Sequence, residues 1–117
     1  MPGISVHVVD VARGQPAAGM FVEVVALDGD DRRVVGTGCV GENGAFTHPM
    51  NTGEGVRAGA HEVLLHAGEF FRLAGHIRDK PAFLEIVALR FNVLDAFEHY
   101  HLPVKITPWG YSVWRGR

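Results

Sequence analysis

Short runs rich in Val, Ile and Phe recur along the chain and are separated by turn-forming stretches such as RGQP, DGDD, GENG and NTGEG. This spacing is typical of β-strands. Eight strands are expected, at residues 4–10, 19–27, 32–40, 44–49, 60–67, 84–93, 100–107 and 111–115. FFRLAGHIRD (70–79) lacks the alternation of apolar and polar residues that is typical of a strand, and it is expected to form a short helix. The pattern predicts an all-β fold, a two-sheet, eight-stranded sandwich with one short helix, in a single domain over residues 1–117.

Three of the predicted strands carry reactive side chains on the face opposite their apolar residues, because successive side chains in a strand point to opposite sides. These residues are Ser5 and His7, then His99, His101 and Lys105, and finally Ser112 and Trp114. Imidazole is suited to taking a proton from water near pH 7, so His7 and His101 are candidate catalysts over a groove. A histidine inside a strand can also be a structural residue, and periodicity alone leaves both interpretations open.

The composition of the chain argues against nucleic acid and membranes as partners. With 11 basic and 13 acidic residues and a formal net charge of -2, the chain has no basic run that would follow phosphates, so nucleic acid is not an expected partner. The lone Cys39 excludes an internal disulfide framework. No segment approaches the roughly 20 apolar residues that a membrane span requires, and the N-terminus does not resemble a leader. We expect a cytoplasmic protein without a membrane partner.

Two patterns that suggest a cofactor or a metal are weak. GTGCVG (36–41) matches the dinucleotide fingerprint, but a turn and another strand follow it where a helix N-terminus should hold the pyrophosphate. His99 and His101 could share a face and bind zinc together with His7, although no carboxylate pair stands nearby. We therefore expect neither a cofactor nor a metal.

Two long motifs at opposite ends of the chain resemble a known family. HVVDVARGQPA (7–17) resembles the opening signature of the transthyretin-like proteins. YHLPVKITPWGYSVWRGR (100–117) resembles their C-terminal signature, which in the enzymes reads close to YHVPLLLSPYGYSTYRGS. The resemblance covers the whole chain. It implies a β-sandwich that pairs edge to edge into a dimer and then into a homotetramer, a dimer of dimers with ligand sites between the dimers.

The best-known enzymes of this family are 5-hydroxyisourate hydrolases, which open a ring amide of the unstable product of urate oxidation. Their catalytic His pair falls on His7 and His101 of this sequence. The non-enzymatic branch, which carries thyroid hormone, has lost both imidazoles, so the resemblance favours an enzyme. The family's catalytic Arg, which follows the Gly of a middle turn, falls on Ala45, and the terminal Ser falls on Arg117.

The departures from the family pattern are concentrated in the implied site. Ala45 can neither hold a planar ureide nor stabilise an oxyanion, as an Arg would. We therefore expect Arg117 and Lys105 to supply the cationic stabilisation. The alternative is that the Arg position has decayed and Arg117 is merely a solvated end. Trp114 replaces the family's Tyr, and together with Ser112, Lys105 and Ala45 it is expected to line a substrate-binding surface of altered shape.

Three functions remain open at this point. The first is hydrolysis of a small cyclic amide, 5-hydroxyisourate or a modified relative such as an N-methylated purine product. The second is another His-assisted reaction on the same scaffold, such as isomerisation or lactone opening. The third is a non-catalytic tetramer that binds a small aromatic or anionic ligand. The aromatic ending WGYSVWRGR (109–117) further predicts that the last strand is tied into the structure and reaches the groove.

Overall fold

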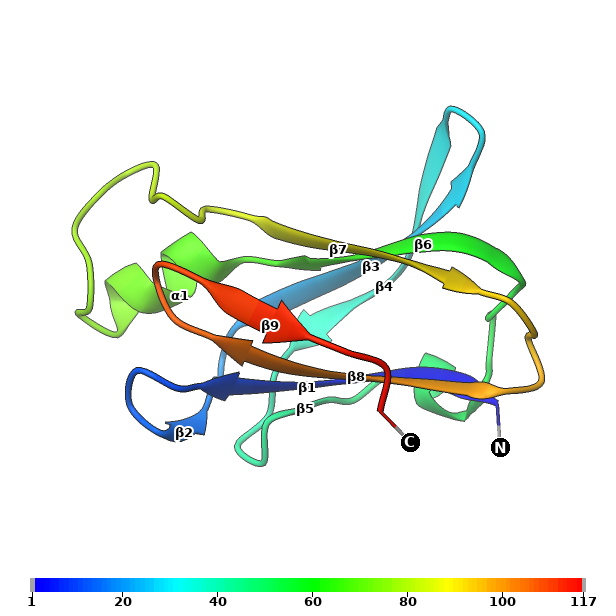
Figure 1. Cartoon of the computed structure of the whole chain (residues 1–117), viewed down its shortest axis with the longest axis horizontal. Helices are drawn as coiled ribbons and strands as arrows, with labels where there is room; N and C mark the ends of the chain where they lie inside the picture. The colour runs from blue at the N-terminus through cyan, green and yellow to red at the C-terminus, as the bar shows by residue number, and fades with distance from the viewer. Residues whose placement is uncertain (1, 117) are drawn as a thin grey trace.

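A computed structural model describes residues 2–116, which form two stacked β-sheets (Figure 1). The strands are β1 (Gly3–Asp10), β2 (Gln15–Pro16), β3 (Phe21–Asp28), β4 (Asp31–Cys39), β5 (Ala45–Phe46), β6 (Gly59–Leu65), β7 (Val87–Val93), β8 (His99–Ile106) and β9 (Tyr111–Val113). One 3-10 helix, η1 (Pro49–Thr52), and one α-helix, α1 (Ala67–Leu73), complete the elements of this part of the chain.

The first sheet has the order β2-β1-β8-β9, and β5 also pairs with β1. β1 and β8 run parallel over their full length, so β2 and β5 share the other edge of β1. The second sheet has the order β4-β3-β6-β7 and is antiparallel throughout. β9 and β7 are therefore edge strands, one in each sheet. Figure 1 shows the sheet of β3, β4, β6 and β7 lying over the sheet of β1, β8 and β9.

The core lies between the sheets and follows the alternation that the sequence predicts. Its members include Ile4, Val6 and Val8 of β1, Val22 and Val24 of β3, Val63 and Leu65 of β6, and Leu102, Val104 and Ile106 of β8. Each of these side chains is buried, and the contacts between them join the two sheets into one hydrophobic cluster. Because every second residue of β1 and β8 is committed to the core, the residues between them face outward.

The predicted two-sheet, all-β fold is confirmed, and each predicted strand overlaps an observed one. Two details differ. The two-residue β2 lies in RGQP, which the sequence pattern treats as a turn. Only residues 45–46 of the predicted run 44–49 are a strand, because Pro49 begins η1 and the His48 ring accepts a hydrogen bond from the Met50 N–H.

The predicted helix is shifted. It begins at residue 67 rather than 70 and ends at residue 73 rather than 79. Gly75 has a φ of 80° and follows the C-cap Ala74, a left-handed position that ends helices and that glycine adopts without strain. Within residues 2–116, no helix has both the length and the apolar character needed to cross a membrane.

Candidate active site

Pairing of β1 with its two neighbours gathers the predicted site residues on the outer face of the first sheet. The β1–β8 register places Ser5 beside His101 and His7 beside Pro103. On the other edge of β1, β5 places Ala45 beside His7. Since directly paired residues share a face, the outer face carries a mixed group of polar and aromatic side chains. They are Ser5, His7, Ala45, His99, His101, Lys105, Ser112 and Trp114.

The last strand completes this outer face. Lys105 pairs with Ser112, and the same register resumes at the bridge between His101 and Gly116. Between these two pairs of residues, Pro103 lies opposite Trp114. Proline has no N–H to donate, so the ladder is interrupted there. The indole therefore lies on the same face as the histidines, and the Lys105 ammonium stands 5.8 Å from its ring centre. The prediction that the aromatic end of the chain is tied into the structure is confirmed for residues 111–116.

His101 is held from two sides. Its Nδ1 lies 2.7 Å from the Ser5 hydroxyl, and its backbone carbonyl accepts a hydrogen bond of 2.7 Å from the Gly116 N–H. A Cβ at Gly116 would come within 2.9 Å of the His101 ring, so glycine is the residue that leaves room for the imidazole. Burial lowers the pKa of His101, and the neighbouring His99 and His7 lower it further. The ring therefore favours its neutral, basic form.

His7 is fixed by the turn between β4 and β5. Its Nε2 lies 2.8 Å from the Asn43 backbone carbonyl. A carbonyl oxygen can only accept, so Nε2 carries the proton and Nδ1 is the unprotonated nitrogen of the neutral ring. Gly44 has a φ of 88°, and a Cβ there would come within 2.7 Å of Nε2. The turn thus requires glycine both for its backbone and for its close approach to His7.

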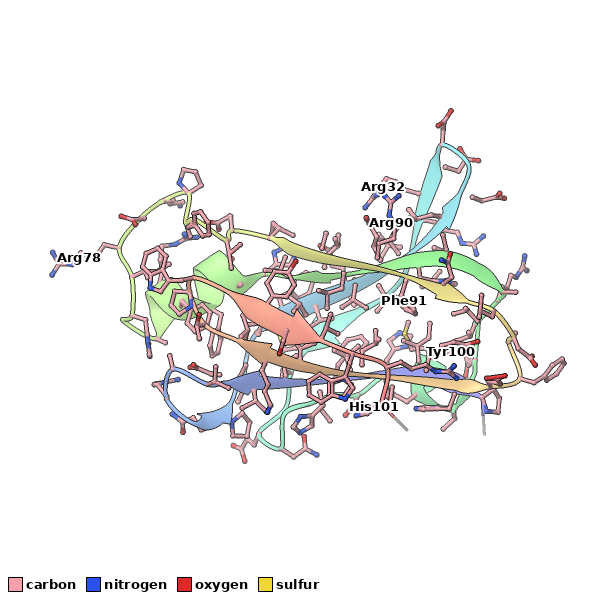
Figure 2. All side chains as sticks on the ribbon, in the orientation of Figure 1. Arg32, Arg78, Arg90, Phe91, Tyr100 and His101 are labelled. Atoms are coloured by element: carbon pink, nitrogen blue, oxygen red, sulfur yellow. The ribbon has the colours of Figure 1, made fainter. Side chains whose placement is uncertain are left out.

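Figure 2 places His101 on the outer side of β8, away from the second sheet. Lys105, Ser112 and Trp114 are exposed, and His7, Ala45 and His101 are half-buried. In a single chain the site is thus an open face. Arg117, the predicted catalytic cation, lies outside the described residues. Its neighbour Arg115 points to the opposite face, where its guanidinium covers the Tyr100 ring at 4.1 Å.

Sequence patterns placed Ser5 and His99 on this face, and gave Ser5 no role and His99 only that of a possible zinc ligand. The Ser5 hydroxyl lies 2.8 Å from His99 Nε2 as well as 2.7 Å from His101 Nδ1. Among residues 2–116 no group of three His, Cys, Asp or Glu side chains is arranged to hold a metal ion. Ser5 could be placed on the outer face from the sequence because it alternates with His7. Its hydrogen-bonding partners could not, because they are 94 and 96 residues away in the chain.

Comparison with known proteins agrees with this architecture. The family model described as HIUase/Transthyretin family matches residues 4–116. The chain belongs to this family. Within the HIUase/transthyretin family, it is 42% identical over 113 residues to 5-hydroxyisourate hydrolase 2 of Rhizobium meliloti (strain 1021), covering 97% of this chain and 94% of that protein. It is 38% identical over 115 residues to the 5-hydroxyisourate hydrolase of Deinococcus radiodurans, covering 98% and 96%.

Solved structures show the same fold. A crystal structure of (S)-allantoin synthase superposes with a TM-score of 0.83 at 26% identity, covering 98% of this chain and 43% of that one. The 5-hydroxyisourate hydrolase of Klebsiella pneumoniae superposes with a TM-score of 0.79 at 23% identity, over 100% of both chains. The transthyretin-like sandwich inferred from the two terminal motifs is confirmed.

Proposed function

We propose that this protein is a hydrolase that opens a ring amide of 5-hydroxyisourate or of an N-methylated relative. One observation carries the proposal. His7 and His101 lie on one outward face, and within the described part of the chain each has one ring nitrogen hydrogen-bonded to another residue. Relatives at 42% and 38% identity that are named 5-hydroxyisourate hydrolases support the substrate class.

The proposed reaction uses the free nitrogen of His101. Nε2 makes no hydrogen bond to any of residues 2–116, whereas Nδ1 is bonded to Ser5. Nε2 takes a proton from water as the water oxygen attacks the ring carbonyl carbon. The carbon–nitrogen bond then breaks, the ring nitrogen receives the proton, and a carboxylate and an opened ureide are formed. His7, with Nδ1 unprotonated, accepts a hydrogen bond from the water or from a substrate N–H.

Cationic stabilisation in this proposal comes from a different element than the family pattern implies. Position 45, beside His7, carries only a methyl group. Lys105 lies on the same face, and its ammonium over Trp114 is placed to attract a planar, negatively charged ring. We keep Arg117 as a second candidate cation on the basis of its sequence position alone. Trp114 and Ser112 border this cationic part of the face and are proposed to contact the substrate.

A homotetramer built as a dimer of dimers is part of the proposal. The site is open in one chain, and its Trp114 remains 48% exposed. The edge strands β7 and β9 flank an apolar hollow of about 250 Å³ that Phe91, Leu94, Leu102 and Val113 help to line. Pairing such edges with a second copy would cover this apolar surface, and apposing two dimers would enclose the site.

The observation at position 45 also favours a second candidate, a tetramer that binds a small anionic aromatic ligand without turnover. A site with Ala45 beside His7 retains an ammonium and an indole, which suffice for binding. An isomerase or lactone-opening activity would use the same imidazoles, but no feature of this face prefers it over amide hydrolysis.

An assay with much less protein than substrate distinguishes an enzyme from a binding protein, because only an enzyme acts on many substrate molecules. Freshly generated 5-hydroxyisourate, and its N-methylated counterpart, would be mixed with protein at about one hundredth of their concentration. Under the hydrolase proposal the protein accelerates the decay of at least one of them over many turnovers. Decay at the spontaneous rate for both compounds, with the protein folded and tetrameric, would contradict it and favour the binding tetramer.

A further inference from the structure

Ser5, His99 and His101 form a continuous hydrogen-bonded chain on the outer face. The Ser5 hydroxyl oxygen lies 2.7 Å from His101 Nδ1 and 2.8 Å from His99 Nε2. Strand geometry explains the arrangement, because Ser5 pairs with His101 across the parallel β1–β8 ladder and His99 lies two residues earlier on the same face. All three side chains are half-buried, so water competes less for these bonds than it would at a fully exposed site.

A serine hydroxyl has one proton to donate, which couples the protonation of the two rings. If Ser5 donates to His99 Nε2, it accepts from His101 Nδ1–H, and His101 Nε2 is then unprotonated and basic. If Ser5 instead donates to His101 Nδ1, His99 Nε2 must be the donor and His101 Nε2 carries its proton. In either arrangement the two neutral rings share the same tautomer. Changing from one arrangement to the other therefore requires the hydroxyl hydrogen to turn and each ring to exchange its proton between Nδ1 and Nε2.

We propose that Ser5 and His99 are positioning residues that set the tautomer of His101 and relay its proton. This inference deepens the hydrolase proposal and rests on it. When His101 Nε2 takes a proton from the attacking water, Nδ1–H passes its proton to Ser5 Oγ. The Ser5 hydroxyl passes its original proton to His99 Nε2. His99, which already holds a proton on Nδ1, becomes the imidazolium, while His101 remains neutral with its proton on Nε2.

The cationic groups near the relay favour a positive charge on His99 over one on His101. Among residues 2–116, the other cationic or titratable side chains on this face are His7 of β1 and Lys105 of β8. Residues 111–113 of β9 add no titratable side chain beyond the phenol of Tyr111. Moving the positive charge from residue 101 to residue 99 carries it about 6.6 Å further along β8 from Lys105. On the opposite face Arg115 donates to the His99 carbonyl at 2.9 Å, which holds the backbone of the relay's last member.

The first test reads the tautomers directly in the resting protein. Long-range proton–nitrogen NMR of protein labelled with nitrogen-15 in histidine distinguishes protonated from unprotonated ring nitrogens, and His99→Phe and His101→Phe assign the signals. The relay requires that neutral His99 and His101 both carry their proton on Nδ1, which leaves His101 Nε2 free to take a proton from water. Finding Nδ1–H on His101 together with Nε2–H on His99 would overturn it, because Ser5 would then accept from both rings and could pass no proton between them.

The second test uses variants that keep or remove the hydroxyl. Ser5→Ala and His99→Phe are expected to lower kcat by about tenfold with little change in KM, because substrate contacts are retained and proton transfer is impaired. Ser5→Thr, which keeps the hydroxyl on a strand that tolerates β-branching, should retain most of the activity. Circular dichroism verifies the fold of each variant.

Unchanged kcat in a folded His99→Phe protein would contradict the relay. So would an unchanged His101 tautomer population in Ser5→Ala. If the wild-type protein hydrolyses neither 5-hydroxyisourate nor its N-methylated counterpart, the hydrolase proposal fails by itself. The coupling of the two rings is then decided by the NMR result, which needs no substrate.

Discussion

The Lys105 ammonium lies 5.8 Å from the centre of the Trp114 ring, across the β8–β9 ladder. An exposed cation over an indole gains about 0.5 to 1 kcal/mol, enough to bias the lysine side chain toward the outer face. His101 lies four residues away on the same strand and face. The pair thus provides a positive, planar surface beside the imidazole that is the proposed base.

Loss of the Lys105 charge should impair hydrolysis. In Lys105→Met the aliphatic stem is retained and the ammonium is removed, so we expect kcat/KM to fall by about tenfold, because the developing anion loses its stabilisation. Lys105→Arg keeps the charge and should retain most of the activity. Steady-state kinetics on 5-hydroxyisourate measures both. Equal kcat/KM in Lys105→Met and the wild type would exclude a role for this cation.

Restoring an arginine beside His7 should raise activity. The side chain of residue 45 lies on the same face as His7, so Ala45→Arg would place a guanidinium near the reacting carbonyl. We expect kcat/KM to rise by about tenfold. Ala45→Met, of similar length and uncharged, is the matched control. An equal effect of the two substitutions would show that size rather than charge matters at this position.

Gly44→Ala should damage the site more than the fold. A Cβ at Gly44 would come within 2.7 Å of His7 Nε2, whereas at Gly19, with a similar φ of 93°, it would meet no atom within 4 Å. Both alanines strain the backbone by about 1 kcal/mol, so thermal unfolding should shift similarly. Only Gly44→Ala should lose hydrolysis, because it displaces His7. Equal activity losses in the two variants would contradict this account.

The activity should persist into mildly acidic solution. Burial, then His99 and then His7 lower the pKa of His101 below its ordinary value of 6.5. The proposed base is active when neutral, so protonation of His101 itself should lower kcat/KM as the pH drops through this lowered pKa. In His99→Phe one repelling neighbour is removed, and the acid limb should move to higher pH. A wild-type acid limb above pH 6.5 would argue against His101 as the base. Lys105 is the other cationic side chain of β8 on this face.

Much of the site's location was predictable because β-strand alternation is a local property. The outward faces of residues 4–10 and 100–107 follow from their buried neighbours, and the structure places His7 and His101 on the same face as predicted. The parallel pairing that brings residues 5 and 101 together is not local. It depends on which strands become neighbours, so the bonds from Ser5 could not be derived from periodicity.

Other details escaped prediction for comparable reasons. The helix boundaries depend on Gly75 at a left-handed φ and on packing of residues 67–73 against the core, which the residue pattern of 70–79 did not reveal. The requirement for Gly44 comes from a contact with His7, a residue far away in the sequence. Arg117 remains a prediction based on sequence position.

The most direct test of the account compares three proteins in one assay, the ultraviolet-monitored decay of freshly generated 5-hydroxyisourate. The wild type and His76→Ala, which removes an exposed imidazole after the helix, should both accelerate the decay. His101→Ala should lose at least about a hundredfold of that acceleration while remaining folded, as expected for removal of a general base. Decay in His101→Ala as fast as in the wild type would contradict the assignment of this face as a hydrolytic site.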